Sequence, residues 1–243
     1  MTPTVPPRVL VVEHQADCGL GRLDPLPGCE QDTVRPYLGD PLPADLAGVH
    51  GLVVLGGAMD AWDDAGSPWL PATRSLLAQA VRTGVPTLGV CLGAQLLAMA
   101  CGAPVGRGAD GPELGVVPVS LLPGADQDPF AAGLPAEVAA PQGHRDVVQE
   151  LPDGAVLLAS SAAYPHQLFR VGDAAWGVQY HPEVTEADFT SWMAEDADAL
   201  AAQGRTPDDA VGGMLAAREA VVASARAHAE SFAAVVRRAA GES

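Results

Sequence analysis

Three short runs of apolar residues, each ending in a tight turn, constrain the fold more than any other feature of the sequence. They are Val9–Val12, Gly51–Leu55 and Val85–Val90. Runs without regular polar alternation indicate strands that are buried on both faces. Between the second and third runs, residues 69–82 carry apolar side chains at helical spacing, and Gly84 ends this pattern. The order strand, helix, strand predicts an α/β fold with an open, mostly parallel sheet sandwiched by helices.

The second half of the chain predicts further strands. Residues 103–154 are rich in Gly, Pro and Asp, and within them only 116–122 has the composition of a strand. We expect that strand to belong to an antiparallel excursion over the site. Three more strands are predicted at 155–159, 167–171 and 175–180.

The C-terminal part of the chain has a helical pattern. Thr185 is a candidate N-cap for a helix whose first turn contains Asp188. Residues 207–240 are rich in Ala and predict one long helix or two shorter ones, with Gly212-Gly213 as the break. We expect these helices to dock a partner, to form a homodimer or only to cover the sheet.

Charge and composition exclude several classes of function. The formal net charge is -17, which disfavours binding to nucleic acids and to anionic membrane surfaces. All 13 basic residues are Arg, which excludes a Schiff-base Lys and a phosphate-loop Lys. The four cysteines form no CxxC pair and have no His at zinc spacing. We therefore predict no metal site and no cofactor.

Targeting signals are not evident in the sequence. Residues 1–7 contain three prolines and no long apolar run, unlike a secretory signal. No stretch approaches the roughly 20 apolar residues that a membrane helix requires. We expect a cytoplasmic protein with reduced thiols.

Cys91 is a candidate nucleophile. It follows a predicted strand, precedes a predicted helix over 92–99, and has Gly89 and Gly93 two positions away on each side. Such a turn places the sulfur at the carboxyl end of the strand, where ligands bind in α/β folds, and at the positive end of the helix, which favours the thiolate. The alternative is one more buried thiol.

His181 and Glu183 are candidate partners of Cys91. They follow the last predicted strand, and residues two apart in an extended segment project to the same side. Glu183 can then accept the Nδ1 hydrogen of His181, which leaves Nε2 to take the thiol proton and later return it to a leaving group. The alternative is a His at a strand end with an unrelated solvated Glu.

Backbone N–H groups next to these residues could form an oxyanion hole. Gly56-Gly57 follows the second strand, and Leu92 follows the candidate nucleophile. We predict that the N–H groups of Gly57 and Leu92 bind the developing oxyanion. A glycine that serves only to allow a positive φ is the alternative at Gly57.

Three ordered motifs resemble the class I, or triad, glutamine amidotransferases, and are especially similar to the amidotransferase half of GMP synthase. They are Leu55-Gly56-Gly57, Gly89–Gln95 and Gln179–Glu183, and the resemblance covers roughly residues 8–185. It implies an amidotransferase, flavodoxin-like sheet. It also implies that Cys91 attacks a side-chain amide, forms a γ-glutamyl thioester, and releases ammonia and then glutamate. We assign residues 1–190 to this catalytic domain and 191–243 to a C-terminal helical extension.

The resemblance also implies substrate contacts at Gly56, Gln95, His144 and Asp146. Gln95 lies one helical turn beyond the nucleophile on the same face. A pocket-wall Gln and an ordinary surface loop are the alternatives.

Two positions depart from the family pattern. Ala58 stands where relatives often have Pro, and Gly143 stands where they often have Trp. These departures bear on the shape of the pocket and leave the three candidate catalytic residues in place.

Three functional hypotheses follow. The first is a glutaminase that passes ammonia to a synthase on another chain, since no phosphate-binding loop is present. The second is a hydrolase or peptidase that acts on other γ-glutamyl amides. The third is a catalytically idle binding protein on the same fold, because a fold does not determine a function.

Overall fold

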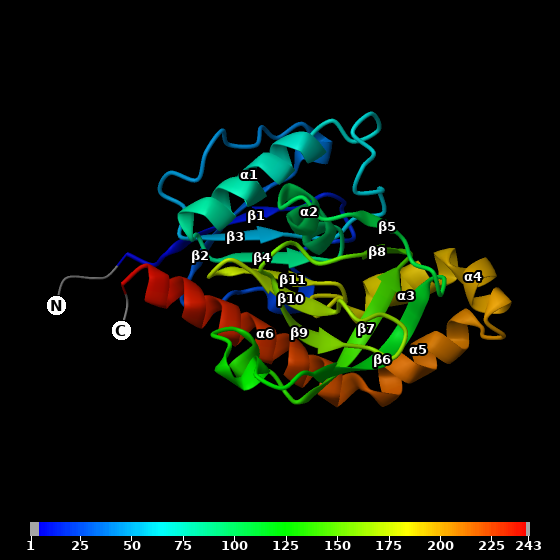
Figure 1. Ribbon diagram of the computed structural model, residues 1–243. Coiled ribbons are helices and arrows are strands. Elements are labelled where there is room, and N and C mark those ends of the chain that lie inside the picture. The colour runs from blue at the N-terminus through cyan, green and yellow to red at the C-terminus, as the bar shows by residue number, and fades with distance from the viewer. Residues whose placement is uncertain (1–4, 242–243) are drawn as a thin grey trace.

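The strands form one sheet of nine, in the order β2-β1-β3-β4-β11-β10-β9-β6-β7 (Figure 1). The structure is a computed structural model and describes residues 5–241. The sheet is built from β1 (Arg8–Val12), β2 (Glu30–Val34), β3 (Gly51–Val54), β4 (Thr87–Val90), β6 (Glu113–Leu121), β7 (Glu137–His144), β9 (Val156–Ser160), β10 (Leu168–Val171) and β11 (Ala175–Val178). A separate antiparallel pair consists of β5 (Val105–Arg107) and β8 (Asp146–Val148).

The half of the sheet that carries the predicted turns is parallel. Strands β2, β1, β3, β4 and β11 pair in parallel, and β10, β9, β6 and β7 continue the sheet in antiparallel fashion. Every residue of β3, β4 and β11 is buried, which is the property that their apolar composition predicted. The predicted α/β sandwich is confirmed.

Helices cover both faces of the sheet (Figure 1). They are α1 (Leu70–Thr83), α2 (Leu92–Ala100), α3 (Glu186–Glu195), α4 (Ala197–Ala202), α5 (Pro207–Ala216) and α6 (Arg218–Ala239), with short 3₁₀ turns at Gly21–Leu23, Pro36–Leu38, Ala125–Gln127 and Ala131–Gly133. Along β1, Leu10 and Val12 pack toward α1 and α2, whereas Val9 and Val11 pack toward α6. This alternation gives the sheet two apolar layers.

The antiparallel part of the sheet contains one strand that the sequence did not predict. Strand β7 lies in the segment rich in Gly and Pro, and it pairs with β6 along its whole length. It contains Pro141, which is compatible with a strand only because β7 forms an edge of the sheet. Pro118 in β6 lies beside β7, while β9 pairs with β6 only at Ser120 and Leu121, so the missing N–H interrupts no ladder on that side.

The C-terminal helices agree with the sequence in type but not in their break. The Thr185 hydroxyl accepts the Asp188 N–H and caps α3, as predicted. The break lies at Ala217, between α5 and α6, and the prediction of a break at Gly212-Gly213 was wrong. These glycines lie inside α5, because the helix is stabilised by burial of residues such as Met214.

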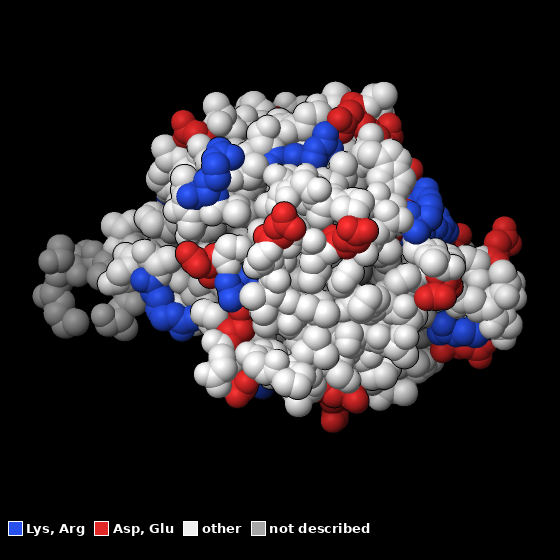
Figure 2. Space-filling view, viewed as in Figure 1, with Lys and Arg blue, Asp and Glu red and all other residues white. Residues whose placement is uncertain are grey.

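The division at residue 190 stays a prediction. Residue 190 lies within α3, and α3, α5 and β6 share a small apolar cluster. Residues 1–4 of the first predicted domain and 242–243 of the second lie outside the described residues. Residues 1–4 are also most of the segment 1–7 that was compared with a secretory signal. Within residues 5–241, none of the helices has the length and apolar character needed to cross a membrane. On the face in Figure 2, basic side chains are scattered rather than gathered in one patch.

Candidate active site

Cys91 lies in a strained turn between β4 and α2. In residues 5–241 it is the only residue other than glycine with a positive φ, which is 49°. A Cβ on Gly89 would lie 2.5 Å from the Gly93 carbonyl oxygen, and a Cβ on Gly93 would collide with the carbonyl oxygen of Val54. Both glycines are therefore required by close backbone approach. The backbone strain at Cys91 is of the kind that is retained where the surrounding structure imposes it, often at functional sites.

His181 and Glu183 form a buried hydrogen-bonded pair beyond the end of β11. The distance from His181 Nδ1 to Glu183 Oε1 is 2.7 Å, and the two residues are 3% and 1% exposed. The Glu183 Oε2 atom is buried and has no hydrogen-bond partner among the described residues. Glu183 is therefore paired with His181 alone through its side chain.

The protonation of His181 is dominated by its acidic neighbours. Burial lowers the pKa of His181, but the charges and hydrogen bonds of Glu183 and Cys91 outweigh burial and raise it from 6.5 to about 10. The imidazole consequently favours its protonated form at neutral pH. The imidazolium of His181 lies between the Cys91 sulfur and the Glu183 carboxylate. With Nδ1 facing the carboxylate, the proton on Nε2 is the one available for donation to a leaving group.

A cavity of about 250 Å³ opens in front of Cys91 and His181. Of the other predicted site residues, Gly57, Gln95, His144 and Asp146 also line it. Lining residues outside the predicted set of catalytic and substrate contacts include Gln15, Asp17, Cys18, Ala58, Asp60, Arg107, Arg145, Trp192, Glu195 and Asp196.

The three remaining predicted residues lie just outside the lining. Glu183 is reached through His181. A Cβ on Gly56 would lie 3.2 Å from the Cε1 atom of His181 and 3.8 Å from the Cβ of Cys91, so this glycine lies against both residues. Leu92 begins α2 directly after the cysteine, and its N–H is one of those that a helix leaves without an intrahelical partner. For Gly57, the structure gives the N–H no hydrogen-bond partner within residues 5–241.

The predicted substrate contacts are held by protein groups. Gln95 Nε2 donates to the Asp146 carbonyl oxygen at 2.9 Å and lies 3.4 Å from Gln179 Oε1. Gln179 Nε2 in turn points at the sulfur of Cys91, at 3.6 Å. An amide pair thus connects the cysteine to the wall formed by β8.

His144 and Asp146 form the far wall. His144 Nε2 lies 3.0 Å from Glu113 Oε2, and its Nδ1 lies 3.2 Å from the Asp146 carbonyl oxygen. The Asp146 carboxylate accepts a hydrogen bond from Arg107 at 2.7 Å, and Arg107 also donates to Asp60. Burial raises the pKa of Asp146, against the opposing effect of the Arg107 charge.

A tryptophan from α3 forms one side of the cavity, and sequence reasoning missed it. The rings of Trp192 and His181 are 4.7 Å apart between centroids and inclined at 64°. A Cβ on Gly143 would lie 3.3 Å from Trp192 Cε3, so Trp192 fills the space beside the glycine that departs from the family pattern. Trp192 lies beyond the last motif, and no local signal in the sequence pointed to it.

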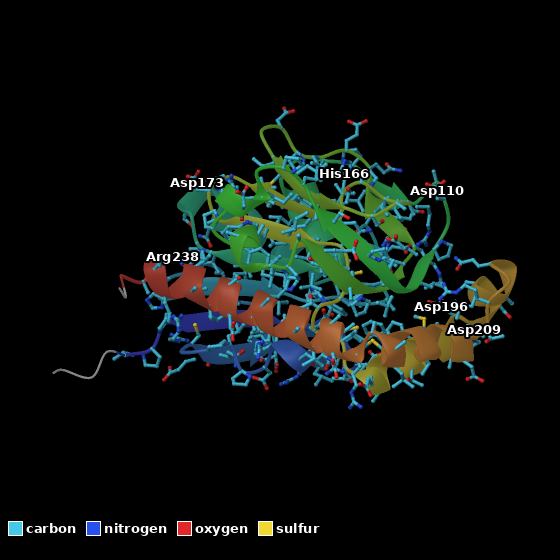
Figure 3. All side chains as sticks on the ribbon, turned by 90° about the horizontal axis from the view of Figure 1, so that it is seen from below. Asp110, His166, Asp173, Asp196, Asp209 and Arg238 are labelled. Atoms are coloured by element: carbon cyan, nitrogen blue, oxygen red, sulfur yellow. The ribbon has the colours of Figure 1, made fainter. Side chains whose placement is uncertain are left out.

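The rim of the cavity combines charges of both signs. Asp196, at the junction of α3 and α4 (Figure 3), forms an ion pair with Arg145. The lining contains five carboxylates and two guanidinium groups. Among the described residues, no group of three or more His, Cys, Asp or Glu side chains is placed to bind a metal ion.

The comparisons with a family model and with known proteins agree with one another. The family model "Glutamine amidotransferase class-I" matches residues 33–197. A GMP synthase from Porphyromonas gingivalis is 32% identical over 156 residues, which are 64% of this chain and 28% of that protein. Gamma-glutamyl peptidase 4 from Arabidopsis thaliana is 31% identical over 159 residues, 64% of this chain and 62% of the peptidase. A glutamine-hydrolyzing GMP synthase subunit from Thermococcus kodakarensis is 39% identical over 105 residues, 43% of this chain and 54% of that protein. The chain therefore spans between 28% and 62% of the length of these relatives.

Solved structures share the fold over nearly the whole chain. A glutamine amidotransferase from Thermotoga maritima superimposes with a TM-score of 0.81 at 27% identity, covering 95% of this chain and 99% of the other. A glutamine amidotransferase from Methylobacillus flagellatus gives a TM-score of 0.80 at 26% identity, covering 97% and 96%. The C-terminal helices are thus included in the match.

Proposed function

Because this chain belongs to the class-I glutamine amidotransferase family, we propose that it is a cysteine-dependent amidase that hydrolyses the side-chain amide of glutamine to glutamate and ammonia. One observation carries the proposal. Cys91 and His181 line the same cavity, and Glu183 is hydrogen-bonded to the ring nitrogen of His181 at 2.7 Å. This arrangement contains a nucleophile, an acid-base group and an orienting carboxylate.

The reaction proceeds in two halves. The Cys91 thiolate attacks the amide carbon, and the oxygen of the tetrahedral adduct accepts hydrogen bonds from the N–H groups of Gly57 and Leu92. When the carbon–nitrogen bond breaks, the imidazolium of His181 gives its proton to the departing nitrogen, which leaves as ammonia. A γ-glutamyl thioester remains. Water then attacks the thioester, His181 takes the proton of that water, and glutamate and the cysteine are released.

Glu183 supports both halves by holding His181 in one tautomer and by stabilising its positive charge. Its second oxygen has no partner in the described residues, so its negative charge is balanced mainly by the imidazolium. An unpaired buried carboxylate is unfavourable, which strengthens the preference for a protonated His181.

We assign substrate binding to residues in the walls of the cavity. Gly56 faces the reacting residues, and Gln95, His144 and Asp146 line the side formed by α2, β7 and β8. Gln95 and His144 are both hydrogen-bonded to the Asp146 carbonyl oxygen, so we assign these three residues to positioning of the γ-glutamyl chain rather than to bond breaking.

The fate of the nitrogen depends on the acyl donor. For glutamine as donor, we propose that ammonia passes to a separate synthase chain, in line with the similarity to the glutamine-hydrolyzing GMP synthase subunit from Thermococcus kodakarensis. A second candidate is hydrolysis of other γ-glutamyl amides. It is favoured by the similarity to gamma-glutamyl peptidase 4, which this chain covers to 62%.

One experiment separates these candidates. The purified chain is incubated with glutamine and, separately, with γ-glutamyl dipeptides, and glutamate and ammonia are measured against the Cys91→Ala variant. Release of glutamate and ammonia from glutamine supports the first candidate, and preferential cleavage of the dipeptides supports the second. Absence of turnover with both substrates contradicts the proposed amidase activity.

A further inference from the structure

The loop that follows β1 connects two parts of the site that are distant in the sequence. The Ala58 N–H donates to Gln15 Oε1 at 2.9 Å, and Gln15 Nε2 donates to Asp17 Oδ1 at 2.7 Å. The other oxygen of this carboxylate, Oδ2, accepts the indole N–H of Trp192 at 2.9 Å. A continuous series of three hydrogen bonds therefore runs from the turn after β3 to α3.

Each end of this series contacts a group with a role in the proposed reaction. At one end, Ala58 directly follows Gly57, whose N–H we assign to the oxyanion hole. At the other end, the Trp192 ring lies 4.7 Å from the His181 ring between centroids. All of these residues line the same cavity.

We infer that Gln15, Asp17 and Trp192 form a brace that couples the oxyanion-hole turn to the catalytic histidine, with Asp17 as its central positioning residue. The inference rests on the proposed function for the roles of Gly57 and His181. None of the three brace residues is assigned contact with a reacting atom.

The chemistry of Asp17 suits this position. A carboxylate is an acceptor at both oxygens: here Oδ1 receives the Gln15 amide and, at 3.9 Å, the Cys18 thiol, and Oδ2 receives the Trp192 indole. Hydrogen bonds to a charged acceptor are stronger than those between neutral groups. Both N–H donors are thereby held in one orientation, and an amide in place of the carboxylate would turn a donor toward one of them.

The brace also fixes the turn at Ala58. Rotation of the peptide between Gly57 and Ala58 would break the hydrogen bond to Gln15, because the same peptide carries the Ala58 N–H. Conversely, displacement of Trp192 would remove the indole hydrogen bond that holds the Asp17 carboxylate, and the Asp17 carboxylate in turn orients the Gln15 amide. A shift of the turn is therefore expected to be accompanied by a shift of the imidazole.

The test uses the full chain and five variants. Gln15→Met and Trp192→Phe each remove the polar groups of one brace residue while keeping most of its volume, and the double variant combines them. Asp17→Asn alters the centre of the brace. Asp153→Asn, at an exposed aspartate, is the matched control.

Two measurements are made on each variant. The first is kcat and KM for glutamine hydrolysis. The second is the rate of alkylation of Cys91 by iodoacetamide as a function of pH, read by mass spectrometry on the peptide that contains it. Alkylation requires no turnover, so it tests the brace even if the chain does not hydrolyse glutamine, an outcome that would count against the proposed function alone.

The brace predicts coupled effects. Each of the three single brace variants is expected to lower kcat about tenfold with little change in KM, since one hydrogen bond to a charged group is lost. The double variant should lose no more than about twice the larger single loss, because its second change falls on a brace that is already broken. Gln15→Met should also change the pH dependence of Cys91 alkylation in the same direction as Trp192→Phe.

The opposite results overturn the inference. In one such result, the fold losses of kcat in Gln15→Met and Trp192→Phe multiply in the double variant. In the other, Gln15→Met leaves the pH dependence of Cys91 alkylation unchanged. If Asp17→Asn does not fold, judged from its thermal unfolding, the Gln15 and Trp192 variants still decide the question. The control should match the unmodified chain in both measurements.

Discussion

Replacement of Glu183 by Gln tests the proposed mechanism most directly. A rise in the pKa of His181 from 6.5 to about 10 corresponds to roughly 5 kcal/mol in favour of the imidazolium, at about 1.36 kcal/mol per pH unit. Glu183 and Cys91 share this effect. Glu183→Gln keeps the shape and an acceptor for Nδ1–H but removes the charge. We expect kcat/KM to fall between tenfold and a thousandfold, or about 1.4 to 4 kcal/mol.

The pH dependence provides a sharper readout than the rate at one pH. In the unmodified chain His181 retains its proton up to about pH 10, so it can protonate the departing nitrogen across the neutral and mildly alkaline range. Without the Glu183 charge, its pKa falls back toward 6.5. The ratio of unmodified to variant activity should therefore increase as the pH rises from 7 to 9. Glutamate formed in stopped samples, quantified by chromatography, gives this ratio.

Stability should follow the same linkage. Because the pKa of His181 is higher in the folded chain than in the unfolded chain, its stabilising contribution is complete below pH 6.5 and is lost as the pH rises through about 10. Urea unfolding of the unmodified chain should show this decline, and Glu183→Gln should flatten it.

Two results would refute this reasoning. An unchanged kcat/KM would mean that Glu183 neither orients His181 nor stabilises its positive charge. A ratio of activities that is constant from pH 7 to 9 would mean that the carboxylate acts by position alone. Glu150→Gln, which removes an exposed carboxylate, is the control and should leave both the rate and the pH profile unchanged.

Three further predictions concern the turns around the cavity. Cys91→Ala should abolish glutamine hydrolysis and leave the thermal unfolding temperature close to that of the unmodified chain. Ala in place of Cys29 or Cys101, which do not line the cavity, should spare activity. Residual turnover in Cys91→Ala would exclude Cys91 as the nucleophile. Ala58→Pro eliminates the N–H that the brace uses, so kcat should fall about tenfold with a small change in KM; a rate equal to that of the unmodified chain would contradict the brace. Gly93→Ala should destabilise the chain by roughly 3 kcal/mol in urea unfolding, since the added Cβ would collide with backbone. The control, Gly212→Ala in an open part of α5, should stabilise the chain by about 0.5–1 kcal/mol. Equal effects of the two changes would argue against steric exclusion at Gly93.

The sequence correctly located the elements whose structure depends on neighbouring residues. The apolar runs of β1, β3 and β4 and the cap at Thr185 were all readable from local pattern. The proximity of His181 and Glu183 follows from their spacing in an extended segment. The tight turn at Cys91 was also expected, because only small residues fit where backbones approach so closely.

Local pattern misled where packing outweighs propensity. Gly212-Gly213 has a cost in a helix, yet α5 continues through it because buried residues such as Met214 and the capping box at Thr206 stabilise the helix. Strand β7 escaped prediction because Pro141 is tolerated only at the edge of a sheet, and the sequence does not state which strand forms an edge.

By itself the sequence determined the buried strands β1, β3 and β4, the turn that presents Cys91, and the pair of His181 with its carboxylate, because each depends on sterics and spacing within a few residues. Only the tertiary structure decided that Trp192 closes the cavity beside His181 and binds Asp17. These two residues are 175 positions apart in the chain. Their contact results from packing of the C-terminal helices onto the sheet, and such long-range contacts leave no periodic or local trace in the sequence.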